Sequence, residues 1–234
     1  LRDGREVWYE GRRVEDVTTF PPFASAVRSM AMLYDLQHTA EHRDVLSVEA
    51  PELGGRIARA FEMPRTPSQL RLKRQAYIVW AEASCGMLGR SPDFMNVMLT
   101  ALAAKRSFFT ELAPERGEAV VAYHRHVARH DLFLTHALLD PQLDKGRLRH
   151  QQRDPGTPLR VVDRTKDGLI VHGIKRIATA APYADEILVW PFPPTFQPGE
   201  DPYANVFAIP MALMALAIKL DSPGPVIYRQ RRVG

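Results

Sequence analysis

The change of pattern between Thr135 and Asp144, reading THALLDPQLD, constrains the fold more than any other stretch of this sequence. Before it, apolar residues recur at the roughly 3.6-residue spacing of amphipathic helices, whereas after it they come in short β-branched or aromatic runs. The sequence therefore predicts an α+β chain in which an N-terminal α-helical domain over residues 1–134 precedes a β domain over residues 135–209.

His136 is the best candidate for a catalytic residue in this stretch. Three apolar residues and an Asp-Pro turn follow it, which places the imidazole at the end of a buried element, beside backbone amides that become exposed. Such a place suits a flat ligand with a polar edge. The alternative is a buried histidine at the junction that only hydrogen-bonds a carbonyl group.

Four helices are predicted in the N-terminal part. Their signals are the helical spacing of apolar residues and two N-caps, Thr66 and Ser91, each followed by a proline. We expect Gly89 to end the second helix and residues 114–117 to separate the third from the fourth. The expected helices cover residues 18–39, 68–87, 92–112 and 118–130, after an exposed hairpin over residues 1–17.

Arg90 is a second candidate, in the loop just before the third expected helix. Asp93 lies against the positive end of that helix. A guanidinium at this position could hold an anion or a peroxide. The alternative is an arginine that pairs with a nearby carboxylate.

Short strands are predicted beyond residue 135. The runs at 159–163, 169–172 and 186–190 favour strands, and TKDG at residues 165–168 supplies a hairpin turn between the first two. Thr179 is flanked by alanines, so its hydroxyl could approach a planar ligand closely. The alternative is a packing site of small residues under a loop.

Composition argues against several other kinds of site. The single cysteine, Cys85, cannot form an internal disulfide or a multi-cysteine metal or iron–sulfur site, and together with the lack of a secretory leader it favours a cytoplasmic protein. The net charge of +4 comes from scattered basic residues, which indicates no nucleic-acid partner. His126 and His130 have the spacing of a metal-binding pair, but no third ligand is evident and no metal site is predicted.

Four ordered motifs carry a family resemblance. They read GRSPDFMN at residues 89–96, HALLDPQ at 136–142, KDGLIVHGIKRIATAAPYADE at 166–186 and DPYANVFAIP at 201–210. Over about residues 1–210 the chain resembles the 4-hydroxyphenylacetate 3-monooxygenase oxygenase family, the large components of two-component flavin-dependent aromatic hydroxylases. Relatives in this family act on chlorophenols, nitrophenols and pyrrole carboxylates.

The resemblance implies an acyl-CoA-dehydrogenase-like architecture and a flavin-dependent reaction. The family has an N-terminal helical domain, a middle β-barrel and a C-terminal helical bundle, usually in a tetramer. A separate NAD(P)H-dependent flavin reductase supplies FADH2, which reacts with O2 to give the C4a-hydroperoxide that hydroxylates a phenolic or related aromatic substrate. In this chain we expect the barrel to be truncated and the bundle to be missing, with weak flavin binding.

The same resemblance implies roles for individual residues. Arg90 matches the arginine that helps to hold the substrate and the flavin hydroperoxide, and His136 matches the catalytic histidine that hydrogen-bonds the phenol oxygen. Phe94 stands in the substrate site, where the hydroxyphenylacetate hydroxylases have tyrosine, unless it is simply core on the first turn of its helix. The residues that match the FAD-binding segment are His136, Ala137, Leu138, Leu139, Gln142 and Thr179.

Residues 210–234 depart from this pattern. The stretch is similar to the start of bacterial polyprenyl-phosphate sugar transferases, but the acidic catalytic residues of those enzymes are absent and sugar transfer is not expected. Residues 207–220 are mostly apolar but too short to span a bilayer, which indicates an interfacial segment with weak membrane contact. The alternative is a helix packed on the barrel. For the chain as a whole, the alternatives to a monooxygenase are a membrane-associated fragment of a polyprenyl-phosphate sugar transferase fusion and an inactive fragment.

Overall fold

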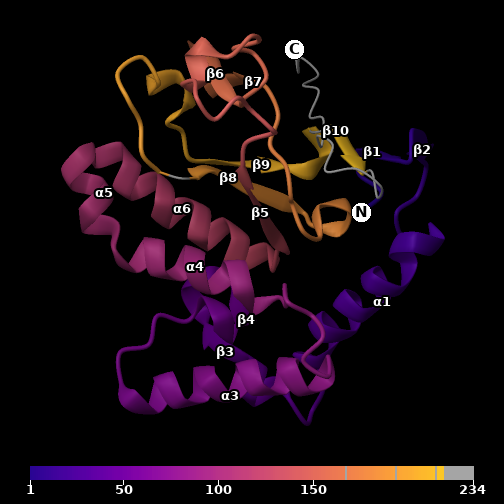
Figure 1. The fold of residues 1–234 in the computed structure, drawn as a ribbon. Coiled ribbons are helices and arrows are strands. Elements are labelled where there is room, and N and C mark those ends of the chain that lie inside the picture. The colour runs from indigo at the N-terminus through magenta and orange to yellow at the C-terminus, as the bar shows by residue number, and fades with distance from the viewer. Residues whose placement is uncertain (167, 193, 214, 219–234) are drawn as a thin grey trace. The chain divides into compact units, whose positions relative to one another are not determined.

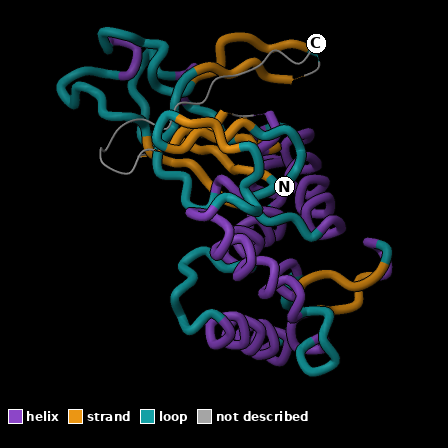
Figure 2. Tube along the Cα trace, turned by 90° about the vertical axis from the view of Figure 1, so that its right-hand side faces the viewer, coloured by secondary structure: helices purple, strands orange, loops and turns teal. Residues whose placement is uncertain are grey.

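The computed structural model describes residues 1–166, 168–192, 194–213 and 215–218 (Figure 1). The chain forms two compact units: Ser25–Leu134, and Leu1–Ala24 together with the residues from Thr135 onward. Figure 2 shows that helices dominate the first of these units, whereas most strands belong to the second.

The helices of this unit pack around a small apolar core. Leu33, Leu46, Ala60, Ala76 and Trp80 form its buried cluster, and the indole N–H of Trp80 donates to the Leu33 carbonyl at 3.1 Å. Burial of such side chains is the main force that holds the helices together. The elements are α1 (Pro21–Leu36), α2 (Arg43–Leu46), α3 (Pro67–Ala83), α4 (Asp93–Ala104), α5 (Arg106–Leu112), α6 (Pro114–His130) and the hairpin of β3 (Ser47–Ala50) and β4 (Gly55–Ala58).

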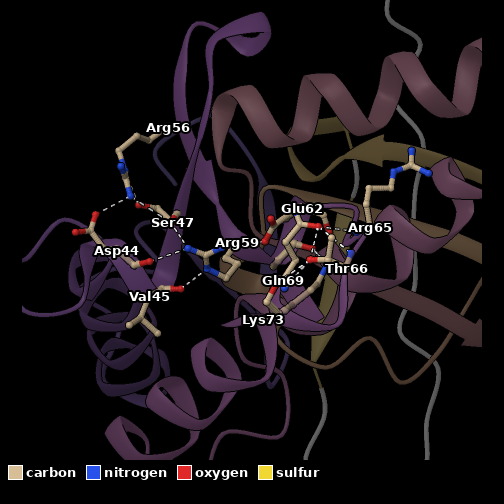
Figure 3. A network of polar contacts seen from close by, with 12 residues as sticks. Asp44, Val45, Ser47, Arg56, Arg59, Glu62, Arg65, Thr66, Gln69 and Lys73 are labelled. Carbon is tan, nitrogen blue, oxygen red and sulfur yellow. Dashed lines mark hydrogen bonds and ion pairs between the residues drawn. The ribbon is translucent and has the colours of Figure 1, made fainter. Parts of the chain in front are cut away.

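A network of buried polar groups ties the β3–β4 hairpin to α3 (Figure 3). The guanidinium of Arg59 donates hydrogen bonds of 2.6, 2.7 and 2.9 Å to three carbonyls in residues 44–47 and pairs with Glu62 at 2.9 Å. The ammonium of Lys73, on α3, donates to the carbonyls of Ala60 at 2.8 Å and Glu62 at 2.5 Å. Arg59 is therefore ion-paired and hydrogen-bonded, and Lys73 is hydrogen-bonded to two carbonyls, which offsets the cost of burying the two cations.

Helix α1 is shorter at both ends than the expected range 18–39, and the later helix boundaries differ from the expected ones at three places. The capping box of Thr66 and Gln69 starts α3 as expected, but α3 ends at Ala83, before the left-handed residues Cys85 and Gly86 and not at Gly89. The expected helix over 92–112 breaks at Lys105 into α4 and α5.

The third difference is the start of α6. Pro114 is the first residue of this helix, where its missing N–H is harmless, and does not belong to a break before it. Gly117 lies inside the helix. The position is occupied by glycine because a Cβ there would overlap the side chain of Thr110 on α5. Close packing of α5 on α6 therefore explains a glycine that the sequence alone presents as a helix breaker.

The strand-rich unit contains two three-stranded sheets and one two-stranded hairpin. Their orders are β10-β1-β2, β5-β8-β9 and β6-β7, and the described residues form no closed barrel. The three predicted strand runs are confirmed in β6, β7 and β8. The strands are β1 (Glu6–Tyr9), β2 (Arg12–Val14), β5 (Leu134–Leu139), β6 (Arg160–Thr165), β7 (Gly168–His172), β8 (Glu186–Phe192), β9 (Phe207–Pro210) and β10 (Ala215–Ile218).

The N-terminal hairpin is part of this unit and not an exposed lead-in. Strands β1 and β2 pair antiparallel as predicted, but Val7 and Val14 are buried because β1 is the central strand of its sheet. The buried guanidinium of Arg5 donates to the carbonyls of Pro182 at 3.0 Å and Ala184 at 2.7 Å. The first residues are therefore tied to a segment almost 180 residues away.

Within the apolar stretch 207–220, residues 207–210 and 215–218 form strands, and neither is part of the packed helix that was the alternative to an interfacial segment. Strand β9 pairs antiparallel with β8, and β10 pairs in parallel with β1. The remaining residues of the stretch similar to sugar transferases, 214 and 219–234, lie outside the described residues. A search of the described helices for one long and apolar enough to cross a membrane finds none.

Candidate functional site

His136 is carried by β5, which begins where α6 ends. Asp131 closes α6 in a left-handed conformation, and the apolar residues after it lead directly into the strand. Within β5 His136 is 8% exposed and Ala137 is fully buried, whereas Leu138 and Leu139 are half-buried. The imidazole thus lies inside the strand, three residues before its last residue, and not at the end of the element as expected.

Trp190, on the neighbouring strand β8, lies beside His136. The two ring centroids are 5.5 Å apart and the ring planes are tilted by 36°. No local pattern in the sequence connects these residues, because they meet only through the pairing of β5 with β8. Trp190 is a neighbour of the candidate histidine that sequence reasoning missed.

The segment around Thr179 is held against β5. The Thr135 hydroxyl donates a short hydrogen bond to the carbonyl of Thr179, whose own side chain is exposed. Ala180 has a φ of +68° and begins the short helical turn Ala181–Tyr183. The structure thus brings the Thr179 backbone together with the strand of His136 and leaves the residue exposed.

Gln142 lies on the exposed loop that follows β5. The side chain of Gln152 closes this loop: its amide nitrogen donates to the carbonyl of Asp144 at 2.9 Å, and its oxygen accepts from the Asp144 amide at 3.0 Å. The loop that carries Gln142 is therefore held at its far end by the two hydrogen bonds between Asp144 and Gln152.

A buried ion network at the end of β5 was not predicted. Asp140 accepts from Lys175 Nζ at 2.6 Å and from Arg149 Nε at 2.8 Å, and Arg149 Nη1 pairs with Glu200 at 3.3 Å. Burial lowers the pKa of Lys175, an effect that the charge of Asp140 opposes. Burial would raise the pKa of Glu200, but the amides of residues 149 and 197 that donate to it, together with Arg149, lower it overall.

Arg90 and Phe94 belong to the helical unit. The guanidinium carbon of Arg90 lies 4.4 Å from the centroid of the Phe94 ring, and Nη1 donates to the Gly89 carbonyl at 2.7 Å. Among the described residues Arg90 forms no ion pair, which argues against the carboxylate-paired alternative. Phe94 is 40% exposed and is therefore not a core residue. Burial raises the pKa of the neighbouring Asp93, against a hydrogen bond from Ser91.

The histidine pair on α6 gains no further ligand. The rings of His126 and His130 lie 4.9 Å apart. Across the ranges that the structure describes, no group of three or more His, Cys, Asp or Glu side chains could hold a metal ion.

Comparison with known proteins gives consistent matches. Residues 1–223 match the family described as 4-hydroxyphenylacetate 3-hydroxylase N terminal, so the match extends past Pro210. The 4-hydroxyphenylacetate 3-monooxygenase oxygenase component of Thermus thermophilus is 43% identical over 211 residues, which are 90% of this chain and 42% of that protein. The 4-nitrophenol 2-monooxygenase oxygenase component of a Rhodococcus species is 33% identical over 97% of this chain and 41% of its own length.

Solved structures agree with these sequence matches. A crystal structure of the oxygenase component of 4-hydroxyphenylacetate 3-monooxygenase complexed with FAD has a TM-score of 0.83 and 39% identity, and the match covers 94% of this chain and 46% of that one. The fold alone is shared with a 4-hydroxybutyryl-CoA dehydratase from N. maritimus, at a TM-score of 0.74 and 19% identity. The chain spans about two fifths of the length of the curated relatives that it matches.

Proposed function

Because this chain belongs to the 4-hydroxyphenylacetate 3-hydroxylase N-terminal family, we propose that it is part of the oxygenase component of a two-component, FADH2-dependent aromatic monooxygenase. Its structural likeness to these oxygenase components supports an acyl-CoA-dehydrogenase-like α+β fold. The observation that carries the proposal is the family match over nearly the whole chain, together with a buried histidine on β5 next to the Thr179 segment.

The residues present in the strand-rich unit suit an isoalloxazine ring. Half-buried Leu138 and Leu139 offer apolar contact, whereas the exposed side chains of Gln142 and Thr179 offer hydrogen bonds without adding charge. His136 to Leu139, with Gln142 and Thr179, would hold FAD, which when bound in its reduced form supplies the activation of O2.

His136 has the residue type that the reaction needs. An aromatic ring is attacked more easily by an electrophilic oxygen when its own oxygen carries negative charge, so a neutral imidazole that hydrogen-bonds the phenol and accepts its proton favours the reaction. The buried environment of β5 excludes water from that proton transfer.

Arg90 is proposed to hold the substrate. Within the described residues its guanidinium carries no ion pair, so its charge is available for an anionic or partly anionic ligand. The substrate is an aromatic small molecule of the phenol class. Phe94 offers it a ring face without a hydroxyl, so the substrate need not be 4-hydroxyphenylacetate.

The partners follow from the same family membership. An oxygenase component of this type needs a separate NAD(P)H-dependent flavin reductase as its source of FADH2, and we propose a homotetramer for the full-length enzyme. We also propose a cytoplasmic location, which the use of a single, unpaired cysteine supports.

Anaerobic titration of the chain with reduced FAD, followed by oxygen and 4-hydroxyphenylacetate or 4-nitrophenol, tests the proposal. We expect reduced FAD to bind weakly and hydroxylated product to form in low yield, and we expect His136→Gln to lose that product. His38→Gln is the matched control, because His38 is an exposed histidine in the helical unit. Equal product from His136→Gln and unchanged chain would contradict the role of His136. Failure of the unchanged chain to bind reduced FAD would contradict its part in the flavin site.

A further inference from the structure

The C-terminal end of β5 is attached to the segment of Thr179 by two consecutive residues, Lys175 and Arg176. Lys175 Nζ donates to the Leu138 carbonyl at 2.9 Å as well as to the Asp140 carboxylate. Arg176 donates from its amide to the Leu139 carbonyl at 2.9 Å and from Nε to the Asp140 carbonyl at 2.9 Å. Lys175 and Arg176 therefore donate a hydrogen bond to each of three consecutive carbonyls, those of residues 138–140.

Asp140 also fixes the loop that carries Gln142. Its second carboxylate oxygen accepts from Arg149 Nε at 2.8 Å, and the amide of Arg149 donates to Glu200 at 3.0 Å. The loop is thus held at its start by Asp140 and beyond its middle by Arg149. Gln142 is exposed and lies between these two residues, which hold the loop on both sides of it.

The charged groups of this network are buried and mutually satisfied. The Lys175 side chain is 5% exposed and the Glu200 side chain 4%, and the carboxylate of Asp140 faces two cations at once. Removing one partner from such a pair leaves a buried charge without compensation, whereas the intact network has a single favourable arrangement. A network of this kind selects one backbone geometry for the segments that it joins.

We infer that Lys175 and Asp140 are positioning residues that hold three segments in one arrangement for FAD: the end of β5, the Thr179 segment and the Gln142 loop. The inference rests on the proposed function, since it assigns these segments to the flavin. Neither residue needs to touch the cofactor. Their effect on FAD passes through the backbone of residues 138–140 and through the loop that Asp140 anchors.

Hydrogen exchange of the full chain without flavin tests the positioning directly. In Lys175→Met and in Asp140→Asn, the amides of Arg176 and Asp144 should exchange at least about tenfold faster, because the local opening free energy falls. The helical unit should keep its exchange rates. Lys175→Arg retains a cation that can bridge Asp140 and the Leu138 carbonyl, and it should restore most of the protection. Lys166→Met, an exposed lysine at the β6–β7 turn, is the matched control.

Flavin fluorescence titration supplies the second readout. Lys175→Met should weaken FAD binding about ten- to a hundredfold, the range found when supporting partners are lost at metal sites, and Lys175→Arg should recover it. Unchanged FAD affinity in Lys175→Met would overturn the positioning role, as would faster exchange spread evenly over both units. Absence of FAD binding by the unchanged chain would overturn the proposed function instead, and with it any role of the network toward FAD.

Discussion

The imidazole of His136 lies beside the indole of Trp190, with 5.5 Å between the ring centroids. Contacts between aromatic rings at such distances contribute about 0.5–1.5 kcal/mol beyond the area that they bury. In a double-mutant cycle of urea unfolding, we expect a coupling energy of about 0.5–1.5 kcal/mol between His136→Leu and Trp190→Leu. The cycle of Trp190→Leu with His38→Leu is the control. Additive effects in the first cycle would show that the ring contact does not orient His136.

Gly173 is predicted to tolerate no side chain. Its φ is +127°, and a Cβ would lie 2.6 Å from both the Cα of Leu159 and the carbonyl oxygen of Pro158. Gly168, in the same hairpin, has a φ of +143° but no atom within 4 Å of its Cβ position. Gly173→Ala should therefore lower the free energy of unfolding by about 1–3 kcal/mol more than Gly168→Ala does. Equal losses in chemical denaturation would mean that only the backbone conformation matters.

The lowered pKa of Lys73 predicts that the free energy of unfolding rises with pH in mild alkali. Burial lowers its pKa from 10.5 to about 8, although the charge of Glu62 opposes the shift. Between these two values the unfolded chain binds the proton more strongly than the folded chain, so the free energy of unfolding increases with pH. Urea unfolding at several pH values from 8 to 10 should show this rise, and Lys73→Met should lose it. A similar slope in both chains would contradict the shift.

Arg5 is expected to be essential for attaching the N-terminal hairpin. Arg5→Met leaves the carbonyls of Pro182 and Ala184 without their donor, at a cost of about 1–3 kcal/mol for each buried acceptor. Arg13 is exposed on β2, so Arg13→Met should change the free energy of unfolding by no more than about 0.5 kcal/mol. Thermal and urea unfolding of both variants would measure the difference. Similar stability of the two would contradict the structural role of Arg5.

Phe94→Tyr tests the substrate preference. The Phe94 ring is 40% exposed, so an added hydroxyl needs no repacking of the helical unit. One new hydrogen bond of about 0.5–1.5 kcal/mol corresponds to about a two- to twelvefold gain in affinity for 4-hydroxyphenylacetate. Equilibrium binding of this phenol to both chains, with phenylacetate as the control ligand, would measure it. A gain that is equal for both ligands would not come from the phenol hydroxyl.

Local signals predicted the elements of the fold well. The capping box at Thr66 and the strands β6 and β7 follow from residues that are adjacent in the sequence, and the structure confirms them. The α+β class and the acyl-CoA-dehydrogenase-like architecture, which followed from the resemblance, are confirmed by the likeness to solved structures. The break at Lys105 was missed because it depends on how α5 packs against α6, which no local pattern records.

Long-range contacts limited the prediction of the candidate site. His136 and Thr179 were chosen from their own sequence surroundings and the family resemblance, and their roles stay predictions. Trp190 and the partners of Asp140 were not found, because strand pairing and a buried ion network bring them together from distant parts of the chain. The domain boundaries at residues 134 and 209 also stay predictions.

The parallel pairing of β1 with β10 has a consequence for synthesis on the ribosome. Glu6 is aligned with Ala215, so the central strand of this sheet lacks one neighbour until more than 200 further residues have been translated. The helical unit, Ser25–Leu134, is continuous and can fold as soon as it has emerged. Until residues 215–218 have been made, β1 is paired only with β2, and its other edge is open to pairing with another strand.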